Sequence, residues 1–161
     1  MSTREVRAVV ALGSNLGERR AHLDGAIAGL RAARGVRVVR CSAWVETEPR
    51  GGTAGQGLYL NGVVELETTL EARALLDLLL GLERDAGRVR RQRNAARTLD
   101  LDLLFFGDAT IEEPGLIVPH PRLEERTFVL EPLAQLDPER RLPRCGRKVR
   151  EQLDRLRAAA R

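Results

Sequence analysis

The fold is decided between residues 70 and 106, in the stretch LEARALLDLLLGLERDAGRVRRQRNAARTLDLDLLFF. Leucines recur at helical spacing from Leu70 to Ala86, which predicts a helix with one apolar face. Gly87 follows at the position where glycine commonly ends a helix. Beyond the arginine-rich connector 88–97, residues from Thr98 to Phe106 have the chemistry of a strand. The stretch therefore predicts a helix, a basic connector and a strand in succession.

The residues before this stretch predict a strand, a helix and two further strands: Val6–Leu12, Glu18–Ala33, Val36–Val45 and Tyr59–Leu70. Thr47–Gly57 is rich in glycine and predicts a long loop. The complete order is strand, helix, strand, strand, helix, strand. This order is typical of an α+β, ferredoxin-like βαββαβ core, in which helices pack on a mainly antiparallel sheet.

The residues after Pro119 predict a C-terminal extension, with two short helical patterns and a charged terminal helix from Lys148 to Arg161. No repeat or low-complexity segment divides the chain, so residues 1–161 are expected to form a single domain. Hydrophobic residues make up 43% and charged residues 31% of the sequence. That composition suits a folded domain with its own core and excludes a disordered chain.

The sequence favours a cytoplasmic protein. No apolar run approaches the roughly 20 residues needed to cross a bilayer, and the apolar stretch near the N-terminus is too short for a secretory signal. Cys41 and Cys145 are far apart, as are His22 and His120, so their spacing assembles no zinc site. We expect two free, buried thiols. The formal net charge of +4 is weak evidence for an anionic partner.

Asp100 and Asp102 lie two residues apart in the predicted strand, so both carboxylates face the same side. An isolated pair of this kind is more often a solvated acidic face. Here the pair directly follows a basic loop with Arg88, Arg90, Arg91, Arg93 and Arg97. Carboxylates hold Mg²⁺ and arginines bind polyphosphate oxygens, so the combination favours a nucleotide site over two solvated surfaces.

The segment Gly-Ser-Asn-Leu-Gly at residues 13–17 also follows a strand and precedes a helix, as a phosphate-binding loop would. It lacks the lysine of a Walker A loop and the third glycine of a dinucleotide-binding loop. A turn in which Ser14 or Asn15 caps the helix is the simpler interpretation.

Several motifs together resemble the 6-hydroxymethyl-7,8-dihydropterin pyrophosphokinase family of folate biosynthesis. The most specific is RNAARTLDLDLL at residues 93–104. The supporting motifs, in chain order, are ALGSNLG at 11–17, YLN at 59–61, GRVR at 87–90, VPHP at 118–121 and RTF at 126–128. The resemblance extends to about Pro138.

The resemblance implies a pyrophosphokinase that uses ATP as co-substrate, releases AMP and works with two Mg²⁺ ions held by Asp100 and Asp102. The positions that match ATP-binding residues of the family are His120, Arg126, Arg88 and Arg97. The last two also match the catalytic arginines of the family.

The resemblance also implies a pterin site formed by Thr47, Tyr59, Asn61 and Phe128. Aromatic faces hold a flat heterocycle by stacking, and an amide matches its donors and acceptors. Glu83 falls on a matching acidic position.

Several positions depart from the pattern of the family. Asn94–Ala96 replaces a tryptophan and a Gly-Pro that often precede the signature arginine, Gly115 stands where some members have arginine, and Arg50–Gly51 replaces more apolar residues. These changes bear on substrate affinity and leave the reaction class as it is. The connector 88–97 and the loop 47–57 are candidate lids over the substrates.

Two other functions compete with this interpretation. A nucleic-acid-binding module would carry an aromatic RNA-binding motif, which is lacking, and Asp100 and Asp102 would repel a phosphate backbone. A homologue without turnover is disfavoured by the intact acid pair with Arg88 and Arg97. We therefore expect a monomer whose partners are ATP and 6-hydroxymethyl-7,8-dihydropterin, with no nucleic acid and no membrane.

Overall fold

The computed structural model describes residues 4–47, 58–87 and 99–160. The core elements are β1 (Val6–Ser14), α1 (Arg19–Ala32), β2 (Val36–Cys41), β3 (Val45–Thr47), β4 (Tyr59–Thr68), α2 (Ala72–Asp85) and β5 (Asp100–Phe106). The elements that follow are β6 (Ile111–Glu113), β7 (Leu116–Val118), the 3₁₀ helix η1 (Leu123–Glu125), α3 (Thr127–Leu136) and α4 (Val149–Ala159).

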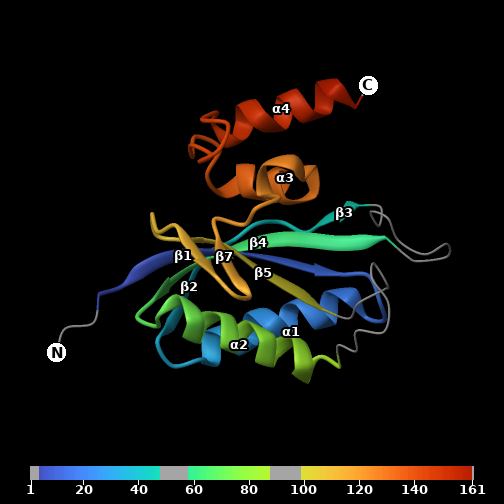
Figure 1. The fold of residues 1–161 in the computed structure, drawn as a ribbon. Coiled ribbons are helices and arrows are strands. Elements are labelled where there is room, and N and C mark those ends of the chain that lie inside the picture. The colour runs from blue at the N-terminus through green and yellow to red at the C-terminus, as the bar shows by residue number, and fades with distance from the viewer. Residues whose placement is uncertain (1–3, 48–57, 88–98, 161) are drawn as a thin grey trace.

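The main sheet has the strand order β2-β4-β1-β5, and every neighbouring pair is antiparallel. The short strand β3 pairs with the end of β4 that β2 leaves open. Helices α1 and α2 cover one face of the sheet, and α3 and α4 lie on the other (Figure 1). This arrangement confirms the predicted α+β, ferredoxin-like fold and adds a helical layer formed by the C-terminal extension.

Alternation along the strands gives the protein a core on each face of the sheet. On β1, Val10 and Leu12 belong to the core under α1 and α2, whereas Val9 belongs to the core under α3 and α4. The second core also contains Leu130 of α3 and Leu153 of α4. Because both faces of the sheet are covered, β1 reads as an almost continuous apolar run.

A β-bulge explains the Leu-Leu-Phe-Phe end of β5. Val9 pairs with Phe105 while Val10 pairs with Leu103, so Leu104 is an extra residue on β5. The bulge turns both Leu104 and Phe105 toward the core under α3, although Leu103 faces α1 and α2.

The predicted strand Val36–Val45 is wrong as one element, because β2 ends at Cys41 and β3 begins at Val45. Between them the Ser42 hydroxyl accepts a hydrogen bond from the Val63 N–H, which displaces regular pairing. The hairpin of β6 and β7 is an addition that the sequence did not predict. Gly87 confirms the predicted end of α2, since its φ of +80° suits glycine.

The proposed cap of the first helix is also wrong. Ser14 belongs to β1, and the N-cap of α1 is Glu18, which makes no capping hydrogen bond through its side chain. Both cysteines are free, but Cys41 is exposed and Cys145 is half-buried, so neither is the buried thiol that we expected. Within the described residues, no helix has the length and apolar character to span a membrane.

Candidate functional site

Three strands bring the predicted pterin and metal residues onto one face of the sheet. Gly13 of β1 pairs with Asn61 of β4 on one side and with Asp100 of β5 on the other. Residues directly opposite each other on neighbouring strands point to the same face, and strands are spaced about 5 Å apart. Asn61 and Asp100 therefore share a face with roughly 10 Å between their Cα atoms. Asp102 follows on the same face, which is the one that α3 covers.

Gly13 keeps the middle of this row open. A Cβ atom added to Gly13 would lie 2.7 Å from Oδ1 of Asn61 and 3.6 Å from Cδ1 of Tyr59. The Asn61 amide therefore lies across β1, in the space that any other side chain would fill. The sequence pattern predicts a turn at Gly13 and does not indicate this role. The available signal was a glycine that continues a strand pattern, which often marks a close approach.

Asn61 is oriented by the neighbouring strand β3. Its Nδ2 donates a hydrogen bond to Oγ1 of Thr47, and Thr47 pairs with Tyr59 across the strands. Arg19 of α1 supports this hairpin, because its guanidinium donates to the carbonyl oxygen of Leu58 at 2.8 Å and to Glu46 at 2.9 Å. The structure thus brings together three of the four residues predicted to bind the pterin.

The acid pair lies on a strand whose opposite face is buried in the apolar core. Leu99, Leu101 and Leu103 are buried in the core under α1 and α2, whereas Asp100 and Asp102 point the other way and are half-buried. Within the ranges described, no three His, Cys, Asp or Glu side chains form a group that could hold a metal by themselves. The pair suits a cation that takes its remaining ligands from a phosphorylated substrate.

Glu83 of α2 binds the backbone of the same strand. Its Oε2 accepts a hydrogen bond of 2.7 Å from the backbone N–H of Leu101, the residue between the two aspartates. Glu83 is only 4% exposed, although it is a charged residue on the last turn of α2. The family resemblance predicts an acidic residue at this position but no role for it.

His120 is anchored to β5 beside the acid pair. Its backbone N–H donates to the carbonyl oxygen of Leu104 at 3.0 Å, and its Nδ1 accepts from the N–H of Arg122 at 3.2 Å. Because Nδ1 is an acceptor, the neutral ring carries its proton on Nε2. Burial lowers the pKa of His120 below its usual 6.5, with Asp102 acting in the opposite direction and Arg126 and Arg122 adding to the decrease.

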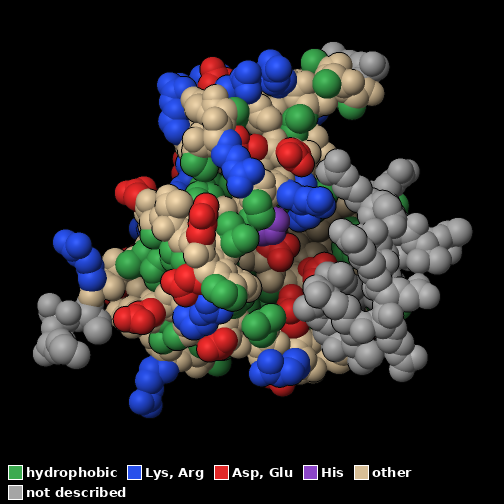
Figure 2. All heavy atoms as spheres, in the orientation of Figure 1, with side chains coloured by type: hydrophobic (Ala, Val, Ile, Leu, Met, Phe, Trp, Pro, Cys, Tyr) green, Lys and Arg blue, Asp and Glu red, His purple; other side chains and the backbone are tan. Residues whose placement is uncertain are grey.

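Arg126 and Phe128 form a pair where α3 begins. The Arg126 guanidinium carbon lies 5.5 Å from the centroid of the Phe128 ring, which is within cation–π range. Arg126 also lowers the pKa of His120 through its charge, so the two described residues predicted to bind ATP influence each other electrostatically. In the view of Figure 2, a histidine side chain lies at the surface with acidic side chains below it and basic side chains beside it.

The remaining predictions fall outside the described residues. Arg88 and Arg97, both predicted to be catalytic and to bind ATP, lie in the range 88–98. The same holds for Asn94–Ala96, for Arg50–Gly51 and for almost all of the two candidate lids. Gly115 is described, and it forms the turn between β6 and β7 with a φ of +75°.

Comparison with known proteins identifies the family. The family model described as 7,8-dihydro-6-hydroxymethylpterin-pyrophosphokinase (HPPK) matches residues 9–138. The chain is 43% identical over 142 residues to a 2-amino-4-hydroxy-6-hydroxymethyldihydropteridine pyrophosphokinase of Synechocystis sp., a match that covers 88% of this chain and 72% of that protein. It is 41% identical over 150 residues to the protein of the same name in Methylorubrum extorquens, where 93% of both chains is covered.

Solved structures agree on the fold. An HPPK-DHPS crystal structure in complex with substrates superposes with a TM-score of 0.74 and 13% identity, over 98% of this chain and 44% of that chain. The Plasmodium falciparum HPPK-DHPS wild type with pteroate gives a TM-score of 0.76 at 13% identity. This chain thus spans less than half the length of these two-part proteins. From its match to the family model and to these relatives, the chain belongs to the 7,8-dihydro-6-hydroxymethylpterin-pyrophosphokinase family.

Proposed function

We propose that this chain transfers pyrophosphate from ATP to the hydroxymethyl group of 6-hydroxymethyl-7,8-dihydropterin, giving AMP and the pterin diphosphate for folate biosynthesis. The relatives named above are pyrophosphokinases for that pterin. The feature of this chain that supports the proposal best is the row Asn61, Gly13 and Asp100, with an amide and a carboxylate on one face and a glycine between them. Such a row can hold the acceptor alcohol next to the metal-bound phosphates.

The pterin is proposed to bind over Gly13. Thr47 takes one hydrogen of the Asn61 amide, which fixes how the rest of the amide faces the heterocycle. Tyr59 shares the face of Asn61, and Phe128 lies in the first turn of α3, the helix that covers that face. A flat ring between two aromatic side chains gains stacking on both sides, while the amide selects its polar edge.

Mg²⁺ fits Asp100 and Asp102 by donor chemistry. Both are carboxylates on one face of a strand, and Mg²⁺ in nucleotide sites commonly takes one or two carboxylates together with phosphate oxygens and water. Two bound ions would neutralise the charge of the triphosphate and of the departing AMP. Leu99, Leu101 and Leu103 alternate with the aspartates and are buried in the opposite core, which keeps both carboxylates on the same face.

The transfer itself forms one bond and breaks another. The oxygen of the pterin hydroxymethyl group attacks the β-phosphorus, the bond from that phosphorus to the oxygen shared with the α-phosphorus breaks, and AMP leaves with the shared oxygen while the hydroxyl proton is lost. His120 can donate a hydrogen bond from its Nε2–H to a phosphate oxygen, and Arg126 supplies positive charge near it. Arg88 and Arg97 are proposed as the catalytic arginines. Positioning and electrostatic stabilisation account for most of the catalysis.

The proposal includes a monomeric, single-domain protein that acts in the cytoplasm. Its test is a coupled assay for AMP, with ATP, Mg²⁺ and 6-hydroxymethyl-7,8-dihydropterin supplied together and then omitted one at a time. We expect AMP only when all three are present, in equal amount with the pterin diphosphate. Folded protein that releases no pterin-dependent AMP would contradict the proposal and favour a ligand-binding homologue without turnover.

A further inference from the structure

The acid pair lies on the last strand of the main sheet. Among the residues that the structure describes, the strand order ends in β5, and its one paired neighbour is β1. On an edge strand, every second backbone N–H points away from the neighbour and needs another acceptor. For Leu101 that acceptor is Glu83, and Leu101 is only 5% exposed, so water is a poor substitute.

Glu83 is held by a rigid support. It lies on α2, whose Leu75 and Leu79 are fully buried in the core under the sheet. A carboxylate as deeply buried as that of Glu83 is costly to keep unless hydrogen bonds compensate for lost water. The bond to the Leu101 N–H supplies such compensation and at the same time ties the strand to the helix.

We propose that Glu83 is a positioning residue, which holds the Leu101 peptide so that Asp100 and Asp102 stay in register to bind the divalent cation of the nucleotide complex. This inference rests on the proposed function, because the metal role of the two aspartates belongs to it. The hydrogen bond from the Leu101 N–H to Glu83 fixes the peptide between the two aspartates, so it orients both side chains without using either carboxylate.

Glu83 could instead act by attracting cations through its negative charge. The two roles predict different effects for substitutions that remove the charge and for substitutions that shorten the side chain. Glu83→Gln keeps the length of the side chain and an oxygen acceptor but removes the charge. Glu83→Asp keeps the charge but is shorter by one methylene, so the bond to Leu101 is lost or lengthened. Positioning requires Gln to be the milder substitution, whereas attraction by charge requires Asp to be the milder one.

The test measures binding of α,β-methylene ATP by calorimetry at a series of Mg²⁺ concentrations. This analogue has carbon in place of the oxygen at which the proposed reaction breaks ATP, so turnover does not interfere. We expect Glu83→Asp to raise the Mg²⁺ concentration for half-maximal binding about 10- to 100-fold, the usual cost of losing a residue that orients a metal ligand. Glu83→Gln should remain much closer to the wild type.

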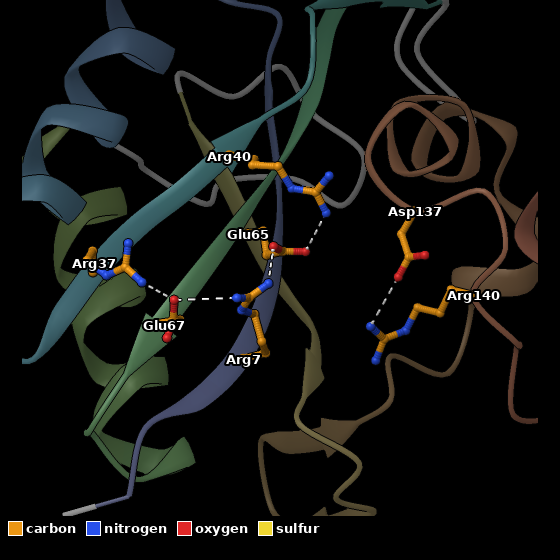
Figure 3. A network of polar contacts seen from close by, with 7 residues as sticks. All are labelled: Arg7, Arg37, Arg40, Glu65, Glu67, Asp137 and Arg140. Atoms are coloured by element: carbon orange, nitrogen blue, oxygen red, sulfur yellow. Dashed lines mark hydrogen bonds and ion pairs between the residues drawn. The ribbon is translucent and has the colours of Figure 1, made fainter.

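A matched control is available on the opposite part of the sheet. Glu65 of β4 is 6% exposed, and its carboxylate accepts hydrogen bonds from Arg7 and Arg40 instead of from the backbone of β5 (Figure 3). Glu65→Asp therefore shortens an equally buried glutamate and should leave the Mg²⁺ dependence unchanged. Hydrogen exchange at the Leu101 amide gives a second measurement, and we expect faster exchange in Glu83→Asp than in the wild type or Glu65→Asp.

The outcomes distinguish failure of the positioning role of Glu83 from failure of the proposed function. An unchanged Mg²⁺ dependence in Glu83→Asp, or a smaller effect for Asp than for Gln, would overturn the positioning role and leave the proposed function intact. A wild-type protein that binds the analogue equally well without Mg²⁺ would overturn the metal role in the proposed function, and this inference with it.

Discussion

The same acidic pattern occurs on two strands of this sheet, with different surroundings. Glu65-Leu66-Glu67 on β4 and Asp100-Leu101-Asp102 on β5 both place two carboxylates on the face toward α3 and a leucine in the opposite core. The β4 pair forms ion pairs with arginines of β1 and β2, namely Arg7, Arg37 and Arg40 (Figure 3). The β5 pair lies in a row with Gly13 and Asn61, next to His120.

This contrast shows that the pattern alone does not identify a metal site. Two carboxylates in register are a structural feature when neighbouring strands supply arginines to them, as on β4. They favour a cation site when the strand is an edge, when the row beside them is kept open by glycine and when the backbone between them is anchored separately, as on β5. The predictions below test this contrast between the β4 pair and the β5 pair.

The largest expected effect is on catalysis. Asp102→Asn should lower the rate of AMP release about 10³-fold, because it removes a ligand of ions that stabilise several kcal/mol of developing charge. Glu67→Gln, the corresponding change on β4, should leave that rate within about twofold, the scatter expected for a site away from the chemistry. The measurement is the coupled AMP assay at saturating substrates. Similar losses in both variants would remove the contrast between the two strands.

The next largest effect is expected on pterin binding at Gly13, between Asn61 and Asp100. Gly13→Ala introduces a Cβ atom 2.7 Å from Oδ1 of Asn61, so the amide must move, and we expect the KM for the pterin to rise about tenfold or more. Gly25→Ala on α1 is the control, since its added Cβ meets nothing within 4 Å. Steady-state kinetics with the pterin as the varied substrate distinguish the two. An unchanged KM in Gly13→Ala would show that Asn61 does not contact the pterin.

How much of this the sequence could predict depends on the range of the interactions. Periods of 3.6 and 2 are local, so the order of helices and strands and the shared face of Asp100 and Asp102 could be predicted. The row through Gly13 requires the register of three strands that are distant in the sequence, and local periodicity does not contain it. The same is true of the arginines that neutralise the β4 pair, because they come from two other strands.

Two features of the fold were missed for related reasons. The bulge at Leu104 depends on pairing with β1, so the local sequence of β5 does not reveal it. The break between β2 and β3 depends on Ser42 bonding to Val63 and on Trp44 occupying the space over Gly62. The roles of individual site residues came from the family resemblance, since an asparagine or phenylalanine in a strand or helix has no distinctive spacing.

A smaller effect is expected on stability at the β4 pair. Glu65→Ala should lower the free energy of unfolding by about 1 kcal/mol, because the ion pairs are lost but both arginines are half-exposed and can be solvated. Urea denaturation at pH 7 measures this change. AMP release at a temperature where the variant is folded should match the wild type. A loss of activity with unchanged stability would assign the β4 pair to the site.

The smallest effect is expected in the C-terminal extension. Hydrogen bonds from Lys148 and Arg150 lower the pKa of Glu139 to about 2 from an ordinary value of 4.5. A carboxylate with a lowered pKa in the folded state stabilises the protein above pH 4.5, and this contribution is lost as the pH falls toward 2. Glu139→Gln should therefore lower the melting temperature slightly at pH 7. The difference in melting temperature between the variant and the wild type should become smaller as the pH falls toward 2. A difference that is constant with pH would contradict this assignment.

Locating the bound metal shows directly whether Asp100 and Asp102 hold it. Crystals of the protein with α,β-methylene ATP and the pterin, grown with Mn²⁺ in place of Mg²⁺, would reveal the ions by anomalous scattering. We predict peaks between the carboxylates of Asp100 and Asp102 and the phosphate oxygens, with none at Glu65 or Glu67. Bound nucleotide with its metal away from Asp100 and Asp102 would contradict the account.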